Sequence, residues 1–157
     1  MKFIIFKLFI KMVLFSVVLF CCSCALKPIP SDYSYIKEDF LKTEFDKLGN
    51  GNVLIYNEAG IFYKFDGTGE VNIWIDDKPL GQIRSNEYII VDLKNGTHKF
   101  EVHHLDLFKM KSVHELEIDH KVKVIKVKPT FVSNKLQITN ELPVKFDKFT
   151  YAKNRAK

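Results

Sequence analysis

Hydrophobic and polar residues alternate along most of the chain beyond residue 51. In residues 70–76, Val71, Ile73 and Ile75 take one phase and Trp74 takes the other, which is the period of a half-buried strand. Further strands are predicted at 52–57, 80–84, 88–93, 98–103, 112–118, 121–128 and 136–139, with a possible last one at 144–151. Short strands between frequent turn signals predict an all-β fold, an antiparallel β-sandwich of about seven strands, over residues 51–152.

Turn-forming residues separate these strands. Asp76 and Asp77 predict a turn over residues 76–79, because Asp side chains bond nearby backbone groups. Asn95 and Gly96 predict a type I′ hairpin turn over residues 94–97, because Asn-Gly tolerates positive φ. The turn that includes Gly96 leads directly into the next strand at His98.

The alternation slips in residues 121–128. Val122 and Val124 take one phase, whereas Ile125 and Val127 take the other. A β-bulge at Val124 or Ile125 would place all four on one face. The competing interpretation is a central strand buried on both faces. The bulge is favoured, because a central strand would force the intervening lysines to be buried or to reach for water.

The N-terminal segment has the pattern of a secretory signal. An apolar run at residues 12–20 follows a basic segment without acids, whose charges are Lys2, Lys7 and Lys11. The apolar stretch is bounded by Lys11 and Lys27, which makes it shorter than the about 20 residues of a spanning helix. An uncleaved membrane anchor is the less favoured alternative.

All three cysteines stand where this segment ends, at Cys21, Cys22 and Cys24. The junction resembles the lipobox of bacterial lipoproteins, in which an aliphatic residue and two small residues precede the lipidated cysteine. Cys24 follows Ser23 and is the favoured site, although Cys21 stands where Leu is usual; Cys22 is the alternative. The resemblance implies a signal peptide at 1–23 and a bacterial envelope protein with a lipid anchor. Ala25 after the cysteine favours the outer membrane. A plain signal peptide is the other interpretation.

Cysteine count and charge exclude several functions of the mature chain. No cysteine follows Cys24, which excludes disulfides, a thiol nucleophile and thiolate-bound zinc in the folded domain. The chain has 24 basic and 19 acidic residues, and three of the basic ones lie in the signal segment. The mature surface is therefore close to neutral, and a nucleic-acid partner is not expected.

Residues 24–50 join the anchor to the sandwich. Pro28 and Pro30 predict a short extended tether. From Ser34 to Leu48, apolar residues recur near every fourth position and predict a single helix, which Gly49 and the glycine at 51 end. A solvated linker is the alternative, and residues 153–157 form a short tail.

Residues 52–102 resemble a family of uncharacterised bacterial lipoproteins with a PEGA-like β-sandwich. The shared elements are a first strand at 53–56, a strand and turn at 71–81 that contain Asp76 and Gly81, a strand at 88–93, and a Gly-x-His turn with Gly96 and His98. The chain departs from the usual form in having Lys94-Asn95 where a proline often precedes the turn glycine. The resemblance implies a fold and a compartment but no reaction.

No catalytic or metal motif is evident. The five histidines include His98 and His104, which share a strand face, and neutral imidazole suits zinc or copper. Half-exposed strand histidines are the favoured interpretation, so no metal and no cofactor are expected. The acids lie mostly at turn or solvent-facing positions, and no nucleophile motif such as Gly-x-Ser-x-Gly occurs. An enzyme is therefore not expected; the alternative is a small cell-wall or glycan hydrolase with two facing carboxylates.

The binding candidates are aromatic. Trp74 lies opposite the predicted core face and is a potential anchor for a partner or a sugar ring, unless the segment 33–48 buries it. Phe62 and Tyr63, in residues 61–65, belong either to an exposed binding loop or to a core strand. The sequence thus predicts a non-enzymatic envelope module that binds a partner protein or a cell-wall component through an edge strand or loops. A passive structural lipoprotein is a further alternative.

Overall fold

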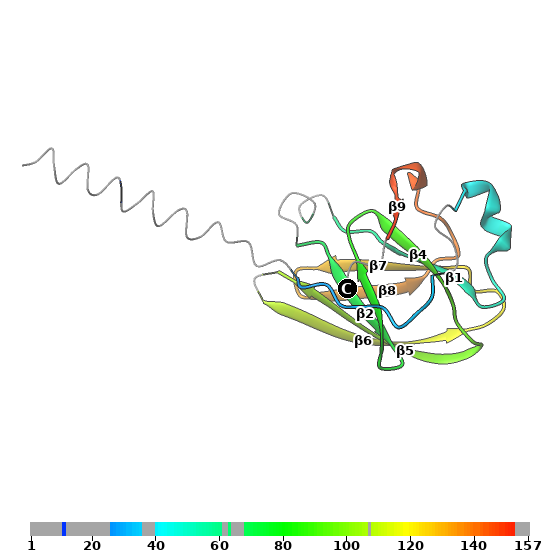
Figure 1. The fold of residues 1–157 in the computed structure, drawn as a ribbon, viewed down its shortest axis with the longest axis horizontal. Coiled ribbons are helices and arrows are strands. Elements are labelled where there is room, and N and C mark those ends of the chain that lie inside the picture. The colour runs from blue at the N-terminus through cyan, green and yellow to red at the C-terminus, as the bar shows by residue number, and fades with distance from the viewer. Residues whose placement is uncertain are drawn as a thin grey trace, which may run out of the picture.

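The computed structural model describes residues 11, 26–35, 40–60, 63, 68–106 and 108–152. Within them, two β-sheets face each other, which confirms the all-β sandwich (Figure 1). The elements are η1 (Lys42–Lys47), β1 (Asn52–Asn57), β2 (Val71–Ile75), β3 (Lys78–Ile83), β4 (Glu87–Asp92), β5 (Gly96–Leu105), β6 (Lys109–Ile118), β7 (Val124–Thr130), β8 (Ser133–Ile138), η2 (Phe146–Lys148) and β9 (Thr150–Tyr151). The expected signal peptide, Cys22, Cys24, Phe62 and the tail at 153–157 lie outside the described residues. No helix in the described part of the chain is long and apolar enough to cross a membrane.

The sheets are mixed rather than purely antiparallel. One sheet has the order β8-β7-β1-β4-β9 and the other has the order β3-β2-β5-β6. In the first sheet, β1 pairs with β7 in parallel and β4 pairs with β9 in parallel. The sandwich predicted with about seven antiparallel strands thus has nine strands in the described residues, and its pairings are antiparallel except for these two.

Two apolar layers hold the fold together. The larger fills the space between the sheets and includes Ile73, Phe100 and Ile125. The smaller lies on the outer face of the five-stranded sheet, where Phe40 and Phe146 cover it. In Figure 1 the segments around η1 (cyan) and η2 (orange-red) lie on this outer side. The central strands β1, β4 and β7 are therefore buried on both faces, which explains their dense apolar runs.

Strand β7 corrects the expectation of a bulge. Its register against β1 and β8 is unbroken, and Val124 faces the outer layer while Ile125 faces the inner one. The two lysines that flank this pair, Lys123 and Lys126, contact residues outside the strand. The ammonium of Lys126 lies 3.6 Å from Glu58, and that of Lys123 lies over the ring of Phe45. The central-strand interpretation is therefore right, because long lysine side chains can leave a covered face.

In the described part of the helix predicted from Ser34 to Leu48, residues 34, 35 and 40–48, the helical element is the short 3-10 helix η1. Tyr33 and Tyr35 are not helical, and their hydroxyls donate to the carbonyls of Ile75 at 3.1 Å and of Leu80 at 3.0 Å. These tertiary bonds override the helical spacing of the sequence. The predicted end is confirmed, since Gly49 adopts a φ of 97° directly after the segment.

The tether is extended as predicted, but it lies on the four-stranded sheet. The side chain of Gln82 donates to the carbonyl of Leu26 at 2.9 Å, and that of Asn72 donates to the carbonyl of Lys27 at 2.8 Å. Farther along, the Asp32 N–H donates to the carbonyl of Pro79 at 2.9 Å. Residues 26–35 therefore cover the edge strand β3, which protects it from pairing with another chain.

The candidate turn residues have three different roles. Asp76 and Asp77 form the predicted β2–β3 turn, with φ of 50° and 64°. Gly96 has the predicted positive φ, 135°, but β4 and β5 belong to different sheets. Residues 94–97 therefore cross between sheets, and the hairpin prediction was wrong. Gly81 lies inside β3 rather than in a turn, at a bulge where Ile73 pairs with Gly81 and Trp74 pairs with Pro79.

Candidate functional site

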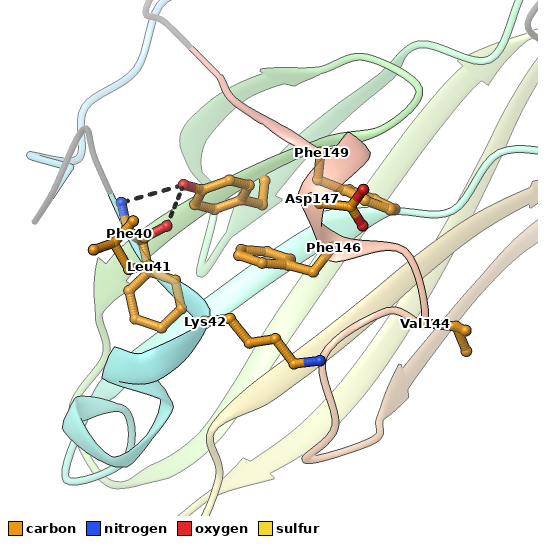
Figure 2. A pocket seen from close by; sticks show the side chains of 8 residues that line it. Phe40, Leu41, Lys42, Val144, Phe146, Asp147 and Phe149 are labelled. Carbon is orange, nitrogen blue, oxygen red and sulfur yellow. Dashed lines mark hydrogen bonds between the residues drawn. The ribbon is translucent and has the colours of Figure 1, made fainter.

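An aromatic groove on the outer face of the five-stranded sheet is the strongest candidate site (Figure 2). Its volume is about 500 Å³, which lies within the range of ligand pockets. One wall comes from the segment that leads into η1, and the other comes from the segment around η2. The lining residues are Phe40, Leu41, Lys42, Tyr88, Val144, Phe146, Asp147 and Phe149.

The floor of the groove is fixed by ring packing and by one tyrosine hydroxyl. The ring of Phe146 lies 5.9 Å from that of Phe40, edge to face, and 5.0 Å from that of Tyr88. The Tyr88 hydroxyl accepts from the Phe40 N–H at 3.3 Å and donates to the Phe40 carbonyl at 3.4 Å. These contacts hold the two walls together, so that the floor needs no ordering when a ligand enters.

The rim of the groove exposes apolar side chains. Val144 is 97% exposed and Leu41 is 64% exposed, on opposite walls. Lys42 and Asp147 place one positive and one negative charge on the same rim. An exposed apolar rim around an aromatic floor is typical of an interaction site.

A second hollow, of about 240 Å³, lies on the other side of the segment 143–149 and shares Val144 and Phe149 with the groove. Its carboxylate is Glu58, whereas that of the groove is Asp147. Neither hollow therefore has the pair of facing carboxylates that glycoside hydrolysis requires.

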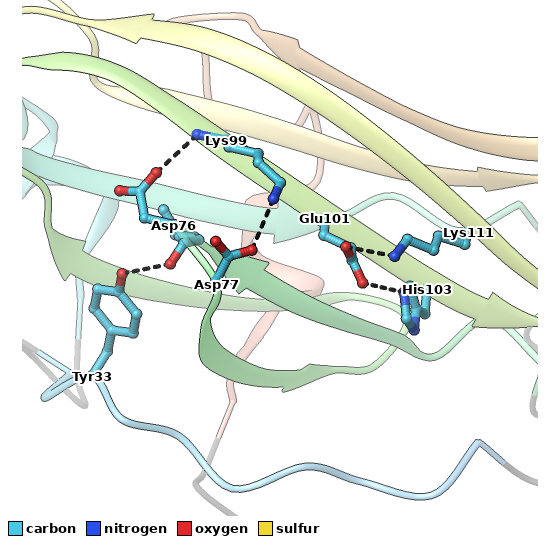
Figure 3. A network of polar contacts seen from close by, with 8 residues as sticks. Tyr33, Asp76, Asp77, Lys99, Glu101, His103 and Lys111 are labelled. Carbon is cyan, nitrogen blue, oxygen red and sulfur yellow. Dashed lines mark hydrogen bonds and ion pairs between the residues drawn. The ribbon is translucent and has the colours of Figure 1, made fainter.

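Trp74 lies outside both hollows. It is half-buried on the outer face of β2, and its ring lies 4.6 Å from that of His103. His103 in turn belongs to a polar network with Glu101 and Lys111, which Figure 3 shows. The Glu101 carboxylate accepts from His103 and from Lys111, each at 2.7 Å. The bond from Lys111 is the main cause of the lowered pKa of Glu101. Trp74 therefore borders a network of charged side chains and lines neither hollow.

Tyr63 is buried, which rules out an exposed binding loop for this side chain, but it is helical and does not lie in the core strand predicted as the alternative. Its ring lies 6.2 Å from that of His104 and 5.6 Å from that of Phe131. Burial lowers the pKa of His104. Across the described residues no three potential ligands are grouped as a metal site would require. His98 and His104 are thus not brought together at a metal site.

His98 and Asp76 form a polar link between two turns. The His98 Nδ1 lies 2.6 Å from an Asp76 oxygen, and its Nε2 lies 2.7 Å from the Lys94 carbonyl. Both neighbours are acceptors, so the protonated ring satisfies them best. Burial of the ring lowers the pKa of His98, but the bonds to Lys94 and Asp76 outweigh this effect and raise it. Partial burial raises the pKa of Asp76, yet bonds from the Lys99 N–H and from His98 lower it on balance.

The groove was missed by sequence reasoning because its walls lie at opposite ends of the domain sequence. Residues 40–42 precede β1, and residues 144–149 precede β9. They meet because β9 pairs in parallel with β4, a pairing that leaves no local pattern. The available signal was the spacing of Phe146 and Phe149, which lies within the stretch predicted as a last strand.

The chain matches no protein-family model, no curated protein and no solved structure. Function is therefore inferred from the residues and their geometry.

Proposed function

We propose that this chain is a lipid-anchored binding module of the bacterial envelope, held in the outer membrane through Cys24. The anchor is supported by the three cysteines directly behind the apolar segment and by their absence from the rest of the chain. It is also supported by the position of Leu26, two residues after Cys24, whose carbonyl is bonded to the sandwich. Membership of the PEGA-like lipoproteins remains a prediction.

We further propose that the aromatic groove binds an apolar peptide segment of a partner protein. The observation that carries this proposal is Val144, which is almost fully exposed beside a buried aromatic floor. A hydrophobic side chain left in water at a concave site costs about 1.5–3 kcal/mol relative to a covered one. A partner that covers Val144 and Leu41 regains part of this free energy.

The chemistry of the groove favours a peptide over a sugar. Sugars require several hydrogen-bonding groups directed at their hydroxyls, but the Tyr88 hydroxyl is already bonded to the backbone of Phe40. The remaining polar groups, Lys42 and Asp147, lie on the rim. An apolar side chain on the aromatic floor, with charged or backbone groups at Lys42 and Asp147, fits this arrangement.

The test uses a photo-crosslinking amino acid at position 144 of the full chain in intact bacterial cells. The matched control is position 113, because Val113 is also an exposed apolar residue but lies on β6, outside the groove. We expect a protein adduct from position 144 that is absent from position 113, and an apolar peptide at the cross-linked site. Equal adducts from both positions, or adducts with glycan alone, would contradict the proposal.

A second variant tests the groove without relying on one probe. Leu41→Asp introduces a charge at an exposed position of the opposite wall, so the fold should persist. The peptide identified by the adduct should bind the unchanged protein and bind Leu41→Asp about tenfold more weakly, which corresponds to 1.4 kcal/mol. Undiminished binding would place the partner elsewhere.

A further inference from the structure

Three exposed apolar side chains gather at one end of the sandwich. Phe108, at the β5–β6 turn, is 73% exposed, and Phe131 and Val132, at the β7–β8 turn, are 69% and 83% exposed. These turns belong to different sheets, but Tyr63 connects them through ring contacts with Phe131 and with His104 near the end of β5. We call this end of the molecule, which the two turns define, the tether end.

The described N-terminal segment begins at the same end. The carbonyl of Leu26 accepts a hydrogen bond from the side chain of Gln82 on β3. In the sheet, Gln82 stands opposite Asn72 of β2, which stands opposite His103 near the end of β5. From there the tether (dark blue in Figure 1) runs toward the opposite end, where the Asp32 N–H is bonded to Pro79. The chain that precedes Leu26 is therefore joined to the sandwich on the side of Phe108 and not on the side of the Asp76 turn.

The length of chain to the proposed lipid is very short. Cys24 precedes Leu26 by two residues, and two residues of extended chain span at most about 7 Å. We infer that the tether end docks on the bilayer that holds the anchor, with Phe108, Phe131 and Val132 inserted among the headgroups. This inference rests on the proposed lipid at Cys24 and adds an orientation to it.

Charges at the tether end fit an anionic lipid surface. Lys109 follows Phe108 directly, and Lys128 and Lys135 face each other across β7 and β8 next to the Phe131 turn. All three are exposed, and none pairs with an acid among the described residues. Among the nearby acids, Glu70 pairs with Arg84 at 2.9 Å and Glu58 lies 3.6 Å from Lys126, whereas Asp106 stands two residues before Phe108. Lysines beside an anionic leaflet are attracted by its negative surface potential.

The shape of the surface also favours a bilayer over a protein partner. The apolar side chains stand on separate turns and form no groove, whereas an interfacial layer accepts individual apolar tips. Three tips alone bind lipid weakly. The lipid proposed on Cys24, two residues before Leu26, would hold the tether end beside the bilayer. Docking is then intramolecular, and the tips meet a high effective concentration of lipid surface.

The test places one fluorescent probe on the full, processed chain in vesicles of phosphatidylethanolamine and phosphatidylglycerol. Since no cysteine follows Cys24, a single introduced thiol is unique once Cys24 carries lipid. The variants are Phe108→Cys and Val132→Cys, with Asn95→Cys as the control at the opposite end. A further probe at Lys109→Cys leaves all three apolar tips intact.

We expect spin-labelled lipids to quench the probes at 108, 109 and 132 at a depth of about 5–10 Å, the range of interfacial insertion. The probe at 95 should respond only to a quencher in water. Fatty-acid labelling of the same preparations tests the anchor separately. An acylated chain whose probes at 108, 109 and 132 stay in water would overturn the docking and leave the anchor standing. If the probes are instead shielded from the aqueous quencher in proportion to the density of protein in the vesicles, and spin-labelled lipids do not quench them, a second copy of the chain covers this end. That result would also overturn the docking on the bilayer. A chain without fatty acid would overturn the anchor and the docking together.

Discussion

The two ends of the sandwich differ in how they meet solvent. The tether end exposes Phe108, Phe131 and Val132. The opposite end, the turn end, consists of polar turns that satisfy their own backbone. There the carboxylate of Asp76 accepts from the Lys99 N–H at 3.0 Å, and that of Asp119 accepts from the Lys121 N–H at 2.7 Å (Figure 3 shows the former).

The contrast extends to the layer beneath the surface. At the tether end the polar links are buried amides: Asn57 joins β1 to the carbonyls of Gly69 and Ile83, and Asn134 donates to the carbonyl of Val102. At the turn end the links are charged and partly exposed, as between His98 and Asp76. The apolar tips of the tether end therefore stand on a rigid base and do not need to pack on the domain. An end built in this way can present apolar groups to a bilayer without loss of stability, while the turn end is suited to water.

The largest expected effect is on the anchor of the tether end. Cys24→Ser should remove the thiol proposed to carry the lipid, so fatty-acid labelling should be lost and the chain should leave the membrane fraction. One or more acyl chains supply the affinity that holds the domain, since each buried CH₂ contributes about 0.8 kcal/mol. Incorporation of labelled fatty acid by growing cells is the measurement. Full labelling of this variant would move the site to Cys22 or Cys21.

The next effect tests the rigid base of the tether end. Asn57→Ala should leave the carbonyls of Gly69 and Ile83 without their buried donor, at a cost of about 2–4 kcal/mol in the free energy of unfolding. Asn72→Ala is the matched control, because that amide makes a single bond, to the carbonyl of Lys27. It should cost about 1 kcal/mol. Urea denaturation measures both, and equal losses would mean that Asn57 is not a structural link.

Substitutions at two glycines can distinguish the cost of backbone strain from the cost of side-chain crowding. Gly81 and Gly96 both have positive φ, so substitution at either should cost about 1–3 kcal/mol. At Gly81 a Cβ would also lie 2.8 Å from the Tyr35 hydroxyl, whereas at Gly96 it would meet nothing within 4 Å. Gly81→Ala should therefore lower the melting temperature more than Gly96→Ala, and Gly96→Val should lower it as well. If Tyr35→Phe removes the difference between the alanine variants, crowding at the hydroxyl is its cause. An unchanged melting temperature in Gly96→Val would mean that this link tolerates a branched residue.

The strands were predictable because alternation is a local property. The bounds of β1 agree with the sequence prediction, and the Asp76-Asp77 turn was identified from residue type alone. The hairpin at Gly96 was wrong because local turn chemistry does not say which sheet the next strand joins. The bulge in β7 was wrong because the second apolar layer comes from Phe40 and Phe146, far away in the sequence.

The same limit explains what was missed at both surfaces. The groove forms between two segments on either side of the sandwich sequence, and only the parallel pairing of β9 with β4 brings them together. The docked tether depends on the hydroxyls of Tyr33 and Tyr35, which stand at the start of a segment whose later apolar residues recur with a helical spacing. Tertiary hydrogen bonds decided between the two conformations, and no residue pattern within that segment encodes them.

The smallest expected effect concerns the pH dependence of the two ends. At the turn end, the pKa of His98 is raised above its usual value of 6.5. The His98–Asp76 ion pair therefore makes its full contribution to the free energy of unfolding below pH 6.5, and this contribution disappears as the pH rises through the raised pKa. At acid pH the contribution disappears again, because the carboxylate of Asp76 becomes protonated as the pH falls through its lowered pKa. At the tether end, burial lowers the pKa of His104, so that histidine reduces stability as the pH falls below 6.5.

His98→Gln should therefore lower the free energy of unfolding by about 1 kcal/mol near pH 6 and by less near pH 9, a modest value because Asp76 is partly exposed. The expected sign follows from the raised pKa, because the protonated ring is the form that donates to both Asp76 and Lys94. Urea denaturation at a series of pH values measures the difference between the two proteins. Asp76→Asn in the His98→Gln background should add little, since the bond to His98 is already lost and asparagine keeps an oxygen that can accept from the Lys99 N–H. A difference that grows toward alkaline pH would contradict the charged form of His98 and would point to a neutral ring that bonds only one of its two neighbours.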